Sequence, residues 1–192
     1  EVGLVAAGMV IGRPKDQYSF EEYAKDGSLA IATTTHAPLP DADESDPNAI
    51  ADLVNQEVPW EDQLQETRGR NHLWVVSQDG SNLKLGKVHK NFGEPGEDIR
   101  AVRFMESYAY VVTFKKTDPL YTFDMSTPTN FRLVGELKVP GFSMYLHPAA
   151  DLKMIGIGFD ADDQGNFAWF QGIQVSIFDV SDPANVSRTD NI

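Results

Sequence analysis

Apolar and polar residues alternate with a period of two over many short stretches of this chain, which is the pattern of half-buried β-strands. The stretches are rich in β-branched and aromatic residues, and turn-forming Gly, Pro, Asp or Asn bound them. Outside one insert, no segment shows the i, i+3, i+4 apolar spacing of a helix. The sequence therefore predicts an all-β fold. The predicted strands include Ser28–Thr35, Asn71–Ser77, Ile99–Phe104, Tyr108–Phe114, Pro119–Phe123, Leu152–Ile157 and Ile173–Phe178.

The insert covers residues 37–67 and is strongly acidic. It holds nine acidic residues and no Lys or Arg. Asp46-Pro47 is typical of a helix start, and the residues that follow include an apolar spacing for one helix face. We interpret the insert as a solvated excursion that a few apolar residues hold to the body. A lid or a cation-attracting flap is the functional alternative.

An internal repeat organises the rest of the chain. The segment FDMSTPTN at 123–130 recurs as FDVSDPAN at 178–185, an offset of 178 − 123 = 55 residues. Asp, Ser, Pro and Asn in this order favour a tight reversal between antiparallel strands.

Repeating units of about 40–50 residues with four short strands are typical of β-propeller blades. We expect four-stranded antiparallel blades at residues 18–91, which contain the insert, at 98–139 and at 142–192. Residues 1–12 would form the last strand of a preceding blade. The prediction is one partial propeller domain, 1–192, of about three blades and one N-terminal strand.

Four segments carry a resemblance to a known family. The chain resembles the secreted C-terminal β-propeller domains that are distantly related to WD40 repeats. This resemblance implies an exported bacterial or archaeal protein, extracellular or in the periplasm or cell envelope, with no established enzymatic activity. The segments are IRAVRFMESYAYVVTFKKTDPLYTFDMSTPTN, GELKVPGFSMYLHP, GIGFDADDQG and SIFDVSDPAN.

A closed propeller needs more than three blades. We therefore expect the chain to be a fragment of a longer protein. Because an open arc exposes blade faces that invite association, two copies would be able to close on each other as a homodimer.

Charge and composition exclude several classes of function. With 16 basic and 29 acidic residues the net charge is −13, so nucleic acid is not an expected partner. The chain has no Cys and thus no disulfide, thiolate metal site or cysteine nucleophile. The apolar stretch from Gly3 to Gly12 is too short to cross a membrane, which takes about 20 residues, so no transmembrane segment is expected.

The segment from Asp160 to Gly165 is the sharpest candidate site. Carboxylates at its first and third positions and Gly at the sixth are how an oxygen-ligated Ca²⁺ loop begins. The side chains of Asp160, Asp162 and Gln164 and the carbonyl of Asn166 would be the ligands. The twelfth position holds Gln171, where a bidentate Glu is usual. A plain hairpin turn rich in Asp and Gly explains the same residues, and both interpretations stay open.

No catalytic residue is predicted. The four histidines, His36, His72, His89 and His147, form no H-x-H or H-E-x-x-H pair, and the chain lacks a G-x-S-x-G segment. The sequence favours a non-catalytic binding module that presents ligand-contacting loops on a propeller face to a protein or glycan. One alternative is a hydrolase or lyase whose central-channel site needs further blades. Another is a Ca²⁺-stabilised structural domain.

Overall fold

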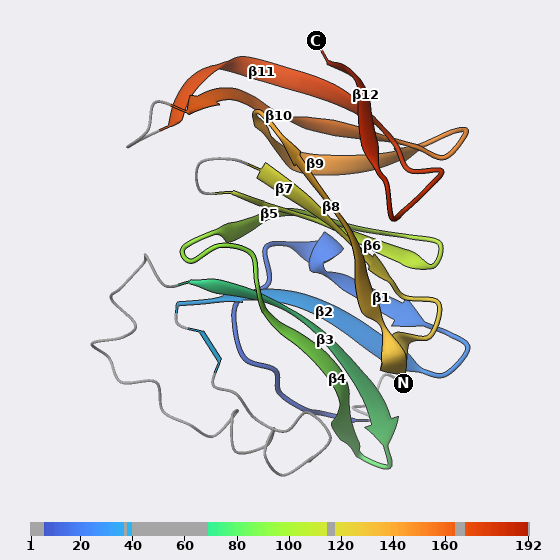
Figure 1. Ribbon diagram of the computed structural model, residues 1–192. Coiled ribbons are helices and arrows are strands. Elements are labelled where there is room, and N and C mark those ends of the chain that lie inside the picture. The colour runs from blue at the N-terminus through green and yellow to red at the C-terminus, as the bar shows by residue number, and fades with distance from the viewer. Residues whose placement is uncertain (1–5, 37, 40–68, 115–117, 164–167, 192) are drawn as a thin grey trace. The chain divides into compact units, whose positions relative to one another are not determined.

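The computed structural model describes residues 6–36, 38–39, 69–114, 118–163 and 168–191 of the chain. Its strands form three four-stranded antiparallel sheets (Figure 1), joined by short connections and two 3-10 turns, η1 (Gln17–Ser19) and η3 (Pro128–Asn130). The predicted all-β fold of four-stranded antiparallel sheets is confirmed. The described residues include no helix long and apolar enough to span a bilayer.

In each sheet the strands follow one another in sequence order, so that neighbouring strands are joined as hairpins. The first sheet contains β1 (Phe20–Tyr23), β2 (Ser28–Thr35), β3 (Arg70–Asp79) and β4 (Asn82–Phe92). The second contains β5 (Asp98–Met105), β6 (Tyr108–Phe114), β7 (Asp118–Asp124) and β8 (Arg132–Val139). The third contains β9 (Phe142–Ala149), β10 (Lys153–Asp163), β11 (Ala168–Asp179) and β12 (Ser187–Asn191).

The chain divides into two compact units. The first consists of residues 1–96 and 128–130 and contains the first sheet. The second consists of residues 97–127 and 131–192 and contains the other two sheets.

In the second unit, two sheets pack on each other around an apolar core. Strand β5 lies beside β9 (Figure 1). Buried Leu146, Met154 and Phe178 of the third sheet cluster with Tyr110 and Leu120 of the second. Each such side chain contributes about 1.5–3 kcal/mol when it is fully removed from water, so this core holds the two sheets together.

The repeated segment forms the predicted reversal at both of its occurrences. The Asp124 carboxylate accepts a hydrogen bond from the Ser126 amide at 3.0 Å, and Asp179 accepts one from the Ser181 amide, also at 3.0 Å. The residue after each Asp also donates its amide to the preceding hairpin turn, Met125 to the carbonyl of Ser107 and Val180 to that of Leu152. These backbone bonds dock each reversal onto its own sheet.

The first sheet is covered on the face that carries Trp74, which we call the Trp74 face. Ile31, Val76 and Val88 surround Trp74 there, and Val10 and Ile11 from the N-terminal segment pack against them. Of the expected N-terminal strand 1–12, the described part from residue 6 onward forms an isolated parallel bridge, between Ala7 and Asn82.

Candidate functional site

One end of each sheet collects the longest and most polar connections. In an antiparallel sheet, the connection between the second and third strands lies at the end where the first strand begins and the fourth ends. We call this the loop end. The acidic insert follows β2 there, residues 115–117 follow β6, and residues 164–167 follow β10. Loops on a rigid sheet scaffold are the usual place for binding residues.

A row of three phenylalanines lies beneath the loop end of the second unit. The ring centroids of Phe114, at the end of β6, and Phe142, at the start of β9, are 4.2 Å apart in a stacked arrangement. The rings of Phe142 and Phe159, near the end of β10, are 5.7 Å apart. Phe114 and Phe142 are buried, while Phe159 is half-buried. The row therefore fixes the two hairpins of the second unit relative to each other.

Arg100 places a positive charge beside this row. The pairing of β5 with β6 shifts register between Ile99 and Ala101, so Arg100 occupies a β-bulge. Bulges re-aim side chains and occur often next to functional sites. The guanidinium carbon of Arg100 lies 5.9 Å from the centroid of the Phe114 ring, within the range of a cation–π contact. The Nε of this half-buried side chain is buried without a hydrogen-bond partner.

Glu97 is the buried carboxylate of the same end. It is 4% exposed, and its Oε2 accepts a hydrogen bond from the Thr113 hydroxyl at 2.7 Å. A buried charge is tolerated only when it is hydrogen-bonded or paired. This arrangement makes Glu97 part of the structure that holds the start of β5 to the end of β6.

A small polar cavity lies between the second and third sheets, on the inner side of Phe142. Its volume is about 10 Å³, close to the least that holds one water molecule. Ser143, Gln174 and Ser176 line it together with apolar residues of both sheets, and all three are buried. Gly141, with φ +82°, also lines it, and a Cβ there would lie 2.6 Å from Oε1 of Gln174. The cavity is too small for a ligand and is a place for a structural water.

The first unit anchors the start of the acidic insert with one asparagine. The Asn91 side chain accepts a hydrogen bond from the Leu39 amide at 2.8 Å and donates one to the Leu39 carbonyl at 2.7 Å. Asn91 has φ 59°, a conformation that Asn tolerates better than most residues. Leu39 is buried in the cluster of the Trp74 face. The chain therefore enters the insert from a fixed point.

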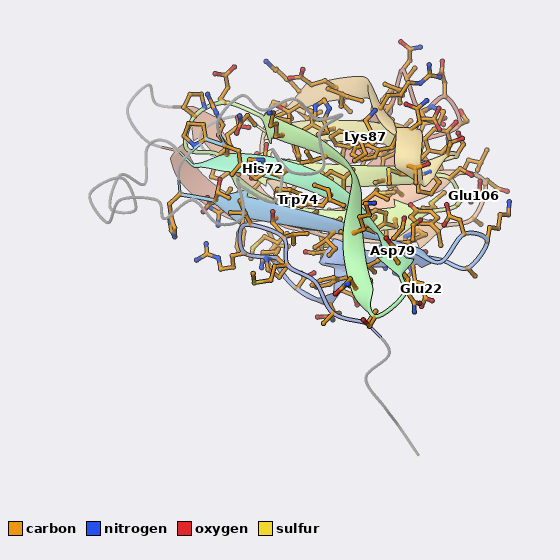
Figure 2. The ribbon with its side chains drawn as sticks, turned by 90° about the horizontal axis from the view of Figure 1, so that it is seen from below. Glu22, His72, Trp74, Asp79, Lys87 and Glu106 are labelled. Atoms are coloured by element: carbon orange, nitrogen blue, oxygen red, sulfur yellow. The ribbon has the colours of Figure 1, made fainter. Side chains whose placement is uncertain are left out.

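His72 completes this anchor. Figure 2 shows it on β3 beside Trp74, and it is fully buried. Its Nε2 lies 2.8 Å from the Thr35 hydroxyl, and its Nδ1 accepts the Asn91 amide at 3.1 Å. Burial, and next the positive charges of Lys90, Arg70 and His89, lower the pKa of His72 to about 3. His72 is thus a neutral structural residue with both ring nitrogens engaged.

The predicted Ca²⁺ loop is described only in part. Asp160, Asp162 and Asp163 lie in β10, so the strand runs on into the segment where a turn was one interpretation. Asp160 is half-buried, and its carboxylate accepts a long hydrogen bond, 3.5 Å, from Gln174. Gln164 and Asn166 lie outside the described residues, as does the side chain of Asp162. The described part of the chain contains no group of three potential ligands, and the Ca²⁺ site stays a prediction.

Sequence reasoning did not find Arg100 or the Asn91 anchor. The bulge at Arg100 is visible only from strand register, and Asn91 acts on a residue 52 positions away. The conspicuous apolar signal was Phe114 at a strand end, which was assigned to a strand without a partner. Of the other histidines, His147 is exposed, and its ring hydrogen-bonds the Tyr145 hydroxyl at 3.1 Å.

Comparison with known proteins adds a family and two relatives. A family model described as a β-propeller domain matches residues 1–192. The chain is 35% identical over 187 residues to an uncharacterized protein of Methanocaldococcus jannaschii, covering 97% of this chain and 24% of that protein. It is 34% identical over 181 residues to an uncharacterized protein of Archaeoglobus fulgidus, covering 93% and 22%. The chain thus spans about a quarter of the length of these curated relatives.

Proposed function

The chain belongs to the β-propeller domain family, and on this basis we propose that it is a non-catalytic binding module of an exported protein. Its ligand-contacting residues lie at the loop end of the sheets, and the ligand is a protein or a glycan. One observation carries this proposal. The connections between second and third strands, which hold the acidic insert and the Asp160–Gly165 segment, all emerge at the end where the sheets are fixed by buried contacts.

The rigidity of the loop end supports a binding role. Asn91 fixes the entry to the insert, and the stacked rings of Phe114 and Phe142 fix the hairpins of the second unit. Preorganised loops lose less conformational entropy when a ligand binds. An interaction module gains affinity from such a scaffold without needing a catalytic residue.

The state of the buried titratable groups supports binding over catalysis. A general base needs a pKa near the working pH and access to the substrate. His72 has a strongly lowered pKa and both ring nitrogens in hydrogen bonds, and Glu97 is buried against Thr113. Both side chains serve the fold.

Charge indicates the kind of ligand that the insert would favour. Nine acidic residues without a basic residue in one connection attract cationic groups, and clustered charge of one sign raises the association rate of the opposite charge. We therefore expect the ligand to present basic or neutral groups toward the insert. Binding through it should weaken as salt concentration rises.

The test uses arrays of glycans and of basic peptides probed with the labelled 192-residue chain. Ligands retained at physiological salt should bind about tenfold more weakly, about 1.4 kcal/mol, when residues 41–66 are replaced by a short Gly-Ser linker. Glu106→Gln, in the turn between β5 and β6 at the other end of the second sheet, is the matched control and should bind normally. Unchanged binding by the linker variant, or release of a cleaved product, would contradict the proposal.

A further inference from the structure

The third sheet has one face that differs from every other sheet face in the described part of the chain. Residues alternate sides along a strand. Met154, Gly156 and Gly158 on β10 are buried, as are Gln174, Ser176 and Phe178 on β11. The residues between them point to the opposite side. We call these the isoleucine face: Ile155, Ile157, Ile173, Val175 and Ile177.

This face is apolar and open to solvent. Ile157 is 41% exposed and Ile173 is 74% exposed, while Ile155, Val175 and Ile177 are half-buried. All five are β-branched aliphatic residues on two neighbouring strands, and register sets Ile157 directly opposite Val175 and Ile155 opposite Ile177. Exposed apolar residues that are contiguous in this way mark an interaction surface.

Charge on the isoleucine face is almost cancelled. Lys153 and Asp179 stand at its end and form an ion pair with each other. Asp190 of β12 lies opposite Ile177, and His147 of β9 lies opposite Ile155. A chain of net charge −13 repels its own copies through most of its surface. A symmetric dimer sets one patch against the same patch, and a face with little net charge avoids like charges at the contact.

The edges and the first sheet do not offer an equivalent surface. The outer edge strand β12 has five residues, including Arg188 and Asp190, and short charged edges resist strand addition. The central strands β2 and β3 of the first sheet are buried along nearly all of their length on both sides. A head-to-tail contact between a first and a third sheet would therefore find no free face on the first sheet.

We propose that the chain forms a symmetric homodimer in which the isoleucine faces of two copies pack on each other. Two sheets pack about 10 Å apart face to face. The reverse face of the same sheet already packs in this manner, where Leu146, Met154 and Phe178 meet the second sheet. This dimer is independent of the loop-end ligand, because its contact residues lie on strands and not on the loops.

Light scattering of the purified 192-residue chain over a range of concentrations tests the proposal. We expect a mass twice the monomer's 21.3 kDa for the native chain. The double variant Ile157→Lys, Ile173→Lys should have the monomer mass. Leu133→Lys on β8 is the matched control, since Leu133 is also an exposed apolar residue (36%) but lies outside the isoleucine face, and it should remain a dimer. A native chain that is monomeric at every concentration overturns the proposal, and so does a double variant that stays dimeric.

Thiol labelling provides a second test that does not depend on a charged substitution. The chain has no Cys, so Ile173→Cys gives a single reactive site on the proposed interface. Its labelling should slow about tenfold as concentration rises through the dissociation constant of the dimer, by mass action. Met9→Cys, at a 75% exposed position of the first unit, should label at one rate throughout. Concentration-independent labelling of Ile173→Cys contradicts the dimer.

Discussion

The Trp74 face of the first sheet and the isoleucine face of the third sheet begin from the same kind of strand and end in opposite environments. On the first, Ile31, Trp74 and Val88 are buried beneath Val10 and Ile11. On the third, Ile157 and Ile173 remain exposed. The difference comes from the covering segment, because both faces are built from apolar residues at alternate positions. A sheet face becomes core only when something packs on it.

The two faces also differ in polar content. The Trp74 face contains a hydrogen-bonded chain in which the Trp74 indole donates to the Thr33 hydroxyl at 2.8 Å and Thr33 donates to the Ile11 carbonyl at 2.8 Å. This chain ties the covering segment to the sheet. The isoleucine face consists of aliphatic side chains, which suit a partner that needs no directional contact. Buried polar groups impose a specific geometry only where each has a partner.

The largest effect should come from Trp74→Ala. The side chain is fully buried, and its loss leaves a large cavity and removes the bond to Thr33. We expect a fall of about 3–5 kcal/mol in the free energy of unfolding, measured by denaturant titration. A change below about 1 kcal/mol would show that the Trp74 face is not a core.

A matched pair of isoleucines tests the comparison directly. Ile31→Ala on the Trp74 face should lower the free energy of unfolding by about 2–5 kcal/mol. Ile157→Ala on the isoleucine face should lower the stability of the monomer by less than about 1 kcal/mol, since much of its surface is already in water. Both variants are measured in the Ile173→Lys background at low protein concentration, so that dimer formation does not contribute. Equal losses would erase the distinction between the two faces.

Acid should weaken the first sheet through His72. Its pKa is about 3 in the folded protein and lies near 6.5 in an unfolded chain. Between these values the unfolded state binds more protons, so stability is full above pH 6.5 and falls as the pH drops toward 3. The loss from this group between pH 7 and pH 4 is about 3 kcal/mol.

The measurement is denaturant unfolding at a series of pH values for the native chain and for His72→Gln. The variant should show a shallower fall between pH 6.5 and pH 4, because the titrating group is gone. His147→Gln, at an exposed histidine of the third sheet, is the control and should keep the native slope. Identical slopes for the native chain and His72→Gln would mean that His72 is not held neutral by burial.

The smallest effect should come from the anchor of the insert. Asn91→Ala removes two hydrogen bonds to the buried Leu39 backbone and places Ala at φ 59°. We expect a loss of about 1–3 kcal/mol. Asn91→Gly keeps the backbone conformation and loses only the side-chain bonds, so the difference between the two variants isolates the backbone strain. If Gly is as stable as Asn, the contacts with Leu39 do not stabilise the first unit.

Local pattern determined much of the fold. Period-two alternation placed Ser28–Thr35 and Tyr108–Phe114 at the bounds that β2 and β6 have. The repeated Asp-x-Ser reversals also form as expected, because a carboxylate reaches an amide two residues ahead without help from the rest of the fold. Pattern did less well at Asp160, where β10 continues beyond the predicted strand after a register shift. Polar residues in a strand interior hide the continuation.

The sequence by itself determined the strands, the reversals, the acidic insert and the absence of thiol chemistry, because each depends on residues close together in the chain. Only the tertiary structure decided which sheet faces are covered and which side chains meet at the loop end. Val10 and Ile11 cover a strand about twenty residues further on, and Asn91 holds Leu39 across 52 positions. Phe114 stacks on Phe142 from another sheet. Such contacts arise when the chain folds back on itself, and alternation along a strand specifies which side a residue faces but not what packs against it.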